Sequence, residues 1–304
     1  MKNNTRFRMN LQLLATKEEG LTETLVKAKE FDFIGQFGNS VEQLLKVLRI
    51  ENRLELSVGS VINTYKSSVT LQGEKVGKGE IIPLSEVKLE KGEPIELTWN
   101  KHRKAVAAED VQKYGYDNSI EKTDTELLRA VQKGVKTKFF TQLKTASTTV
   151  KGVGLQGALA AAWGSVATKF EDDEVTTIAF INPLDVADYL ANANITTQEV
   201  FGLRYVEGFL GVDVAIITTL VEKGTLYATA AGNLNVAYAN LSNGELSKVF
   251  DFTTDETGLI GITHDLNKAR LTAETVTASA LEMFAERVDG IVKATIEAPA
   301  VVGK

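Results

Sequence analysis

The stretch Gln72-Gly73-Glu74-Lys75-Val76-Gly77-Lys78-Gly79-Glu80 lies between two runs of alternating apolar residues. Its three glycines loosen the backbone and its charged side chains need water, so it predicts an exposed turn. Alternating apolar positions predict half-buried strands, and here they are Val61, Tyr65, Val69 and Leu71 before the turn and Val87, Leu89, Ile95, Leu97 and Trp99 after it. The sequence therefore predicts a long two-stranded hairpin over residues 58–101.

The predicted hairpin has a thin apolar face, and an isolated hairpin is only marginally stable in water. Something outside the two strands must therefore hold it. The domain that carries the hairpin and a neighbouring subunit both remain open as that support.

The residues before the hairpin predict an arm and a short helix. Met1 to Gly38 is polar and weakly patterned, which is typical of a flexible arm. Ser40 to Gln43 has capping-box spacing ahead of Leu44, Leu45, Val47 and Leu48, so an amphipathic helix is expected to begin at Ser40. An ordinary N-terminal domain helix is the alternative.

A long helix is predicted after the hairpin. Thr123-Asp124-Thr125-Glu126 is a second capping box, and one apolar stripe follows it, formed by Leu127, Leu128, Val131, Val135, Phe139 and Leu143. A helix from Thr123 to Lys144 would be about 33 Å long, which is enough to cross a whole domain.

The remaining residues alternate short strands and helices, which predicts an α+β fold with mixed sheets. Asn182-Pro183 supplies a favoured N-cap and first helical residue. Strands are expected at Val175–Ile181, near Val212–Ile217, Leu226–Thr229 and Val236–Tyr238, and at Val288–Ile296.

Composition limits the possible functions. The 304 residues carry a net charge of -6 and include no cysteine and only two histidines, His102 and His264. Cysteine chemistry is excluded, and acid–base catalysis or metal binding would depend on carboxylates or lysines. The acidic balance argues against nucleic acid as the primary ligand. No apolar stretch is long enough to span a bilayer, so we expect a soluble protein made in the cytoplasm.

Gly152-Val153-Gly154-Leu155-Gln156-Gly157 matches the G-x-G-x-x-G dinucleotide fingerprint. That fingerprint requires a buried strand before the glycines, whereas Thr145 to Lys151 is polar and trails a helix. The acidic residues Glu171 to Glu174 precede the next strand and therefore lie at its wrong end for a ribose ligand. We expect a flexible linker here, and a nucleotide site is the alternative.

Other candidate ligands are weakly supported. Glu171 to Glu174 lacks the alternate spacing of a calcium loop, so a solvated turn is expected. His102 and His264 lack metal or triad spacing and are expected to be surface histidines. The basic run Lys101 to Lys104 has no interleaved aromatic residues, which favours a strand end or subunit contact over a nucleic-acid site. No catalytic, cofactor or metal site is predicted, so the chain is not expected to be an enzyme.

The order of elements resembles the major capsid proteins of tailed bacteriophages, which have the Hong Kong ninety-seven type fold. The hairpin followed by Ile81-Ile82-Pro83-Leu84-Ser85 is similar to that family's E-loop, and Ala105 to Leu143 is similar to its spine helix. Thr177 to Pro183 resembles the entry to the axial domain, and Gly208 to Val214 and Lys223 to Tyr227 resemble its strands. Ala285-Glu286-Arg287-Val288-Asp289-Gly290-Ile291-Val292 resembles the family's ending.

The resemblance implies five segments. Residues 1–57 would form the N-terminal arm and short helix, 58–101 the E-loop, 102–174 the peripheral domain with the spine helix, and 175–245 the axial domain. Residues 246–304 would complete the axial domain and supply the closing strands of the peripheral domain.

The resemblance also implies self-assembly into hexamers and pentamers that form an icosahedral virion shell around double-stranded DNA, built in the host bacterial cytoplasm. A portal and a separate scaffolding protein are expected partners, and DNA would be held without sequence specificity. Contacts to neighbouring subunits are expected from Gly73, Glu74, Lys75, Gly77 and Lys78 at the hairpin tip and from Arg6, Phe7 and Arg8 in the arm. Covalent linkage through Lys75 or Lys78 is not expected, because no matching asparagine and glutamate are assigned.

Two other functions remain open at the level of sequence. An encapsulin-like bacterial compartment would use the same fold to enclose an enzyme instead of a genome. A nucleotide-dependent oxidoreductase, based on Gly152 to Gly157, is the alternative from a different class.

Overall fold

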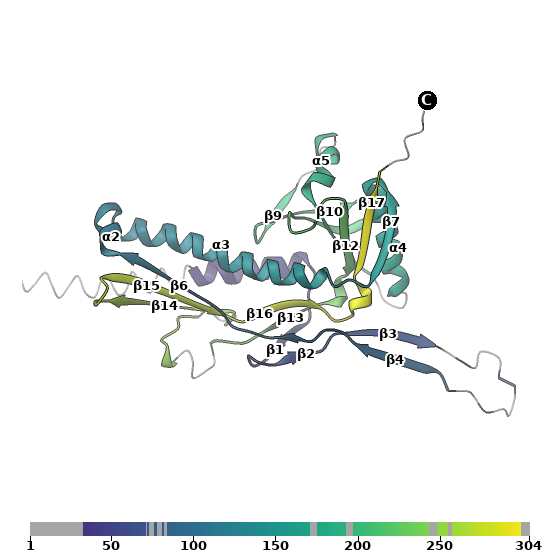
Figure 1. Cartoon of the computed structure of the whole chain (residues 1–304), viewed down its shortest axis with the longest axis horizontal. Coiled ribbons are helices and arrows are strands. Elements are labelled where there is room, and N and C mark those ends of the chain that lie inside the picture. Colours follow the sequence, from purple (N-terminus) through teal and green to yellow (C-terminus); the bar gives the residue numbers. More distant parts are fainter. Residues whose placement is uncertain are drawn as a thin grey trace, which may run out of the picture.

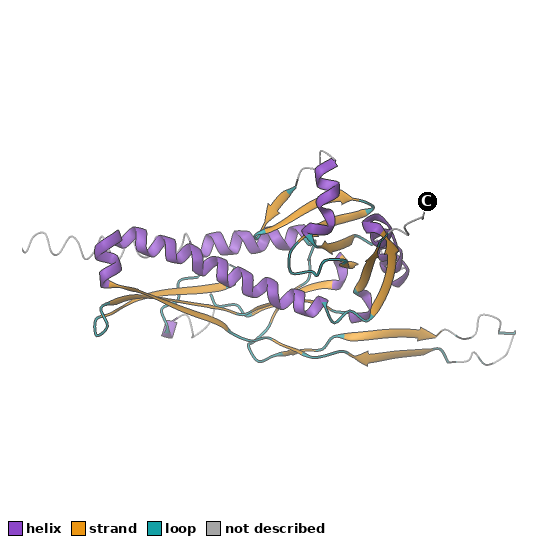
Figure 2. Ribbon diagram, turned by 45° about the horizontal axis from the view of Figure 1, so that its top comes forward, coloured by secondary structure: helices purple, strands orange, loops and turns teal. Residues whose placement is uncertain are grey.

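The computed structural model describes residues 33–70, 72, 76–77, 81, 84–170, 175–192, 197–242, 248–254 and 257–298. Figures 1 and 2 show an elongated body of helices and strands from which one hairpin projects at an end. The helices are a segment over residues 33–47, α2 (Ala108–Tyr114), α3 (Tyr116–Leu143), α4 (Gly154–Lys169) and α5 (Pro183–Asn192), with 3-10 turns η1 (Ala231–Asn233) and η2 (Val288–Gly290).

The strands form five sheets in the described part of the chain. Their bounds are β1 (Arg53–Glu55), β2 (Val61–Ile62), β3 (Tyr65–Thr70), β4 (Glu86–Lys91), β5 (Ile95–Glu96), β6 (Asn100–Ala107), β7 (Thr148–Val153), β8 (Thr177–Ile181), β9 (Gln198–Val200), β10 (Leu203–Phe209), β11 (Val212–Ile217), β12 (Thr225–Ala230), β13 (Leu234–Tyr238), β14 (Ile260–Asn267), β15 (Thr272–Ser279), β16 (Leu281–Ala285) and β17 (Val292–Glu297).

The largest sheet is mixed. Its order is β7-β17-β12-β8-β11-β10-β9, in which β8 is parallel to β11 and antiparallel to β12. The predicted α+β class with mixed sheets is therefore confirmed. Smaller sheets have the orders β14-β15-β6 and β1-β13-β16, and the pairs β2–β5 and β3–β4 complete the set.

The central strand β8 is buried on both faces, as expected where helices cover both sides of a sheet. Ile178 and Phe180 point into the cluster that also contains α3 and the helix over 33–47. Ala179 and Ile181 point the other way, into a cluster with α4. One strand therefore joins the two halves of the hydrophobic core.

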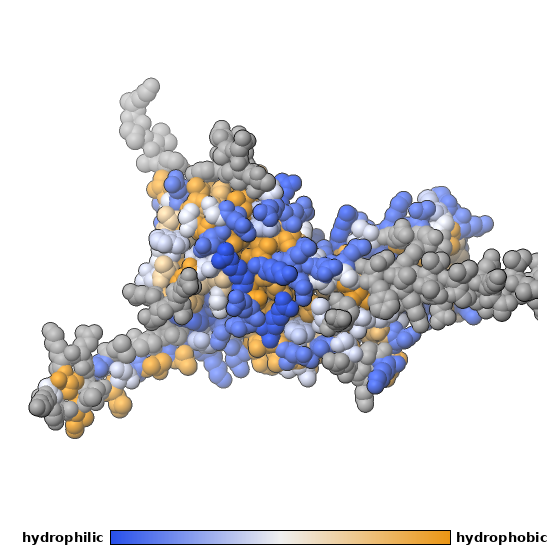
Figure 3. Space-filling model, turned by 180° about the vertical axis from the view of Figure 1, so that it is seen from behind, coloured by the Kyte–Doolittle hydropathy of each residue, from blue (hydrophilic) through white to orange (hydrophobic). Residues whose placement is uncertain are grey.

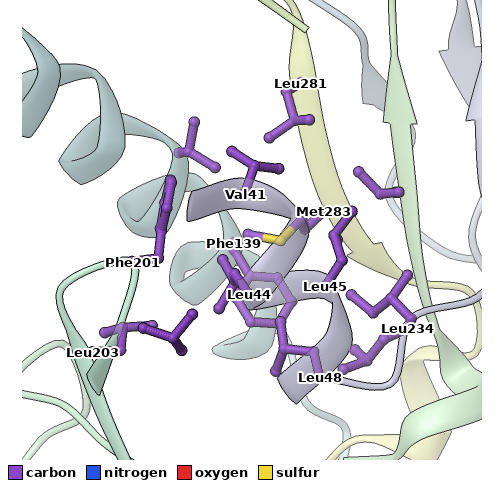
Figure 4. Packing of buried hydrophobic residues seen from close by; sticks show 14 of the residues in the cluster. Val41, Leu44, Leu45, Leu48, Phe139, Phe201, Leu203, Leu234, Leu281 and Met283 are labelled. Carbon is purple, nitrogen blue, oxygen red and sulfur yellow. The ribbon is translucent and has the colours of Figure 1, made fainter. Parts of the chain in front are cut away.

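The N-terminal helix begins earlier than its capping box predicted. Residues 33–47 are helical, and Phe33, Ile34 and Phe37 are buried against the main core, so the predicted helix start at Ser40 was wrong. The prediction of a flexible arm was wrong for residues 33–38, and residues 1–32 lie outside the described part of the chain. Ser40 lies inside the helix and donates from Oγ to the Phe37 carbonyl at 2.8 Å. Figure 4 shows the buried side chains of this helix, among them Val41, Leu44, Leu45 and Leu48, packed with Phe139 and Met283.

The long helix is present and also begins earlier than predicted. The helix α3 begins at Tyr116, so Thr123 lies inside it and does not cap it. Its Oγ1 donates to the Ser119 carbonyl at 2.7 Å, one turn back. The expected apolar stripe is buried at every position except Leu127, which is half-buried.

The later strands and helices match the predicted order. Asn182 caps α5 by accepting a bond from the Leu184 amide at 2.9 Å. Strand β11 has the predicted bounds, and β8, β12 and β13 lie within two residues of theirs. The last strand starts at Val292, because Val288–Gly290 forms η2 first.

The glycine-rich stretch is not a linker. Strand β7 precedes the turn and α4 begins at Gly154, whose φ of +67° suits glycine. A Cβ on Gly152 would overlap the backbone of Gly157 and Ala158, so chain packing accounts for this pair of glycines. The strand that a nucleotide fingerprint requires is present, but it is the edge strand of its sheet and not a crossover point between two halves.

Replacing Gly152 by alanine should destabilise the fold. The added methyl group would push β7 away from α4, and overpacking of this kind costs about 1–3 kcal/mol. Gly164→Ala is the matched control, because its Cβ meets no atom within 4 Å and a helical Gly→Ala change gains roughly 0.5–1 kcal/mol. Chemical denaturation of both variants checks the expectation, which fails if Gly152→Ala is as stable as the native chain.

Candidate functional site: an assembly surface

The β3–β4 hairpin projects from the body of the molecule (Figures 1 and 2). Its strands pair from Tyr65↔Lys91 to Thr70↔Glu86 and extend away from the body (Figures 1 and 2). Successive side chains of a strand point to opposite faces. One face of β4 therefore carries the charged Glu86, Lys88 and Glu90, and the other carries Val87 and Leu89.

Apolar side chains of the hairpin lie in water. Val87 is 62% exposed and Leu89 65%, and near the tip Ile81 is 94% and Leu84 91% exposed. The prediction that these strands are half-buried was wrong for β4, because every one of its residues is exposed. In Figure 3 the hairpin extends at the lower left and carries hydrophobic residues along its length. The apolar face of this hairpin is therefore the candidate assembly surface.

The base of the hairpin is firmly attached to the body. The Tyr65 amide donates to the Glu286 carbonyl of the body at 3.1 Å, and the Gly92 amide closes the base of the hairpin itself by donating to the Thr64 carbonyl at 2.8 Å. A Cβ on Gly92 would overlap the buried side chain of Thr64 and press on Val288. These contacts hold the root of the hairpin, and its outer strands extend beyond them.

Arg287 and Asp289 form a cluster of contacts beside the base of the hairpin. The Arg287 guanidinium contacts the Asp289 carboxylate at 3.2 Å and lies 5.0 Å from the centre of the Phe170 ring. Asn233 exchanges two hydrogen bonds with the backbone of Arg287, at 2.8 and 2.9 Å. The Arg-x-Asp pattern was visible in the sequence, but its partners come from distant segments and could not be identified there.

Most of the predicted contact residues lie outside the described part of the chain. This holds for Gly73, Glu74, Lys75 and Lys78 at the tip and for Arg6, Phe7 and Arg8 in the arm, whereas Gly77 is described. The predicted solvated turn at Glu171 to Glu174 also lies outside the described residues. Their predicted roles stay predictions.

The basic run of β6 is largely used within the chain. Arg103 contacts the Glu274 carboxylate at 2.5 Å, and Lys104 contacts Asp124 of α3 at 2.5 Å. Lys101 lies 5.7 Å from the centre of the Trp99 ring. His102 and His264 lie on β6 and β14, on either side of the central strand β15.

A groove runs between α3 and the hairpin base. It has a volume of about 670 Å³ and is lined by Ile95, Thr98, Ala130, Lys133, Gly134, Thr137, Lys138, Thr141 and Glu282. Lys138 of α3 forms an ion pair with Glu282 of β16 and donates to Thr98 Oγ1 at 3.2 Å. Burial raises the pKa of the Glu282 carboxyl, and the Lys138 charge opposes that rise.

This pKa shift predicts a pH-dependent stability difference. A raised pKa in the folded state means that Glu282 contributes most below pH 4.5, the unfolded value, and that this contribution is lost as pH rises through the folded pKa. Glu282→Gln should therefore gain stability relative to the native chain at neutral pH, and the gap should close on acidification. Urea denaturation at several pH values measures it.

Glu274→Gln is the control with the opposite sign. The Arg103 guanidinium lowers the pKa of the Glu274 carboxyl, so its contribution is present at neutral pH and is lost as pH falls through that lowered value. If both variants show the same trend with pH, the assignment of Glu282 is wrong.

A second apolar surface lies at the opposite end of the molecule from strands β3 and β4 (Figure 1). A hollow of about 300 Å³ is formed there by Val106, Ala108, Val111, Leu266, Asn267, Lys268, Leu271, Thr272 and Ala273. Leu266 and Leu271 are 60% and 67% exposed. This surface was not predicted from the sequence, although two leucines flanking a charged turn were a usable signal.

Within the described ranges, no cluster of three or more histidine, aspartate or glutamate side chains could hold a metal ion. The described helices also include none that is long and apolar enough to cross a membrane.

Comparison with known proteins shows a similarity of structure. No protein-family model and no curated protein matches the sequence. The structure is similar to the SrpI encapsulin complex from Synechococcus elongatus, with a TM-score of 0.52 at 11% identity, over 82% of this chain and 86% of that chain. The chain has the Hong Kong ninety-seven type capsid fold.

Two further structures were matched at lower scores. A virus-like particle from Pyrococcus furiosus has 15% identity over 88% of this chain and 98% of that chain, with a TM-score of 0.49. The capsid of cyanophage P-SCSP1u has 10% identity over 82% and 86%, with a TM-score of 0.47. Both scores lie below 0.5, so the fold assignment rests on the similarity to the SrpI encapsulin complex.

Proposed function

We propose that this chain is the major capsid protein of a tailed bacteriophage, which assembles through hexamers and pentamers into a closed shell around double-stranded DNA. The observation that carries the proposal is the projecting β3–β4 hairpin, whose apolar side chains are exposed although its base is firmly attached. The Hong Kong ninety-seven type capsid fold supports it.

The energetics favour a neighbouring subunit as the cover of this hairpin. Fully burying a side chain such as Val87 or Leu89 is worth about 1.5–3 kcal/mol, and Ile81 and Leu84 of the same hairpin are also exposed. A contact from the hairpin of one copy to a different surface of the next is heterologous, so it closes into a ring when the rotation between copies allows it.

The remaining parts of the proposal follow the family resemblance. Residues 1–57 would be the arm and short helix, 58–101 the E-loop, 102–174 the peripheral domain and 175–245 the axial domain, with 246–304 completing both domains. The seven-stranded sheet takes β7 and β17 from outside the range 175–245. The hairpin tip and Arg6, Phe7 and Arg8 would contact neighbours, and a portal and a separate scaffolding protein would be partners.

Light scattering with negative-stain imaging of the purified full chain tests the proposal. We expect uniform rings or shells whose mass equals that of a whole number of hexamers and pentamers. A chain that stays monomeric or dimeric at high concentration, both alone and when produced with the neighbouring genes of its source, would overturn it.

The contents of the particles distinguish a phage capsid from an encapsulin-like compartment. Nuclease-protected double-stranded DNA inside particles from the native source supports the capsid. Particles that lack DNA and hold one co-purifying enzyme support the compartment, and they leave shell formation itself intact.

A further inference from the structure

Strands β15 and β16 form one nearly continuous run beneath α3, with only Ala280 between them. Directly paired residues of neighbouring strands lie on the same face of a sheet. Thr277 pairs with Ile262 of β14, which belongs to the core cluster of α3, and Thr275 pairs with Lys104 of β6, which binds α3. Thr275, Thr277 and Ser279 therefore face α3.

The two elements lie side by side and match in length. Lys104, beside Thr275, donates to the Ile120 carbonyl of α3 at 3.2 Å, and Gln142 of α3 binds the backbone of Ala285. From residue 120 to residue 142 a helix rises about 33 Å. From residue 275 to residue 285 a strand covers about the same distance. The alignment is visible in Figures 1 and 2.

The inner half of α3, from Val131 to Leu143, is firmly held. It lies against the apolar residues of β16, with Leu281, Met283 and Ala285 in the same cluster as Val131, Val135 and Phe139. The Gln142 side chain accepts from the Ala285 amide at 3.1 Å and donates to its carbonyl at 3.4 Å. The Lys138–Glu282 ion pair adds a further contact.

The outer half, from Tyr116 to Leu128, lies over a polar strand. Thr275, Thr277 and Ser279 are only 2%, 1% and 1% exposed, in positions where a core strand normally carries apolar side chains. Within the described residues, Thr277 Oγ1 and Ser279 Oγ have no hydrogen-bond partner, and neither has Nδ2 of Asn100, which pairs with Ser279. Buried polar atoms left without partners weaken the contact between two elements.

We infer that the outer half of α3 lifts or shifts on the β6–β14–β15 sheet as a separate unit, while the inner half stays fixed to β16. The change occurs at Ala280, where the strand beneath the helix passes from hydroxyl to apolar side chains. The outer half is otherwise held by the Lys104 contacts with Asp124 and with Thr123. The Ser119 hydroxyl also donates to the Asp110 carbonyl of α2 at 3.2 Å. The buried apolar contacts of this half are few and include Ile120 and Leu128.

The consequence for assembly rests on the proposed function. The sheet β6–β14–β15 carries the apolar hollow at the end of the molecule, so a movable outer half lets this end change its angle to neighbours. A subunit placed in both five-fold and six-fold rings needs such freedom. The motion of the outer half of α3 belongs to the single chain, so it can be tested without a shell.

Thiol reactivity provides a direct test, because the chain has no cysteine. Thr277→Cys and Met283→Cys place one thiol each on the same run of strand at positions only 1% and 4% exposed. With a small thiol reagent we expect the cysteine at 277 to react at least about tenfold faster, which corresponds to about 1.4 kcal/mol between local openings. Equal rates at the two positions would overturn the inference.

Hydrogen exchange of the full chain provides a second test. Amides of α3 within 116–128 should exchange faster than those within 131–143. The pair Thr277→Val and Ser279→Ala removes the unpartnered hydroxyls at little change in shape, and it should slow exchange of the outer half by about tenfold while leaving the inner half unchanged.

Thr229→Val is the matched control for that variant. Thr229 is fully buried, but its Oγ1 donates to the Gly290 carbonyl at 3.0 Å and accepts from Asn233 at 3.0 Å. Removing the Thr229 hydroxyl should speed amide exchange around Thr229, since the Gly290 carbonyl and the Asn233 amide group are left without this partner. Unchanged exchange of the outer half in the Thr277 and Ser279 double variant would contradict the inference, whether or not particles form.

Discussion

Shell assembly should fail when Leu89 is replaced by aspartate, while the folded subunit keeps its stability. Leu89 is 65% exposed on the apolar face of the hairpin, so in the subunit the new carboxylate stays in water. Against a neighbour it would be buried without a partner, which costs roughly 3–5 kcal/mol at every copy of the contact. Sedimentation velocity should show subunits or small oligomers in place of shells.

The control for this variant is Lys88→Gln on the opposite, charged face of the same strand. Assembly should persist, since the ion pair of Lys88 with Glu86 at 3.1 Å is exposed to solvent. Thermal unfolding of both subunits should stay within about 0.5 kcal/mol of the native chain, as is usual for surface substitutions. Normal shells from Leu89→Asp would show that the apolar face of the hairpin does not contact a neighbour.

The largest effect on stability is expected from Phe180→Ala. Phe180 is fully buried, and its ring lies edge-on to those of Phe139 and Phe140 of α3, with centroids 5.6 and 5.4 Å away. Truncation leaves a cavity at the junction of the central sheet and α3, so the free energy of unfolding should fall by about 3–5 kcal/mol. Chemical denaturation of the unassembled subunit measures this loss.

Phe250→Ala is the matched control, because the same side chain is 56% exposed there and its ring lies 5.9 Å from that of Phe252. Its cost should be about 1 kcal/mol or less. A similar loss from both variants would mean that burial does not set the stability of the sheet–helix junction.

The periodic parts of the fold were predictable from sequence. The stripe from Leu128 to Leu143 and the strands around Phe180 and Val214 carry residues whose spacing matches one helix face or a buried strand. Local spacing determines these faces, because 3.6-residue and two-residue repeats place side chains before any tertiary contact forms.

The sequence predictions were wrong where the same local pattern had a different structural role. Ser40 and Thr123 have capping-box spacing, yet both hydroxyls bond back to the preceding turn inside a helix. The polar run before Gly152 conceals a strand, because β7 lies at the edge of its sheet and exposes every second residue. A hydroxyl or a polar edge has the same sequence pattern in either role, so only its partners identify it.

By itself the sequence determined the hairpin, the long helix and the mixed α+β order, since each depends on the spacing of apolar residues and on turn-forming glycines. The tertiary structure decided that β4 keeps its apolar face in water, that Gly152 approaches Gly157, and that hydroxyls lie beneath one half of α3 and apolar side chains beneath the other. Alternation specifies which side chains share a face of a strand. What that face meets depends on elements far away in the chain, and for the hairpin we propose that it is another copy of the chain.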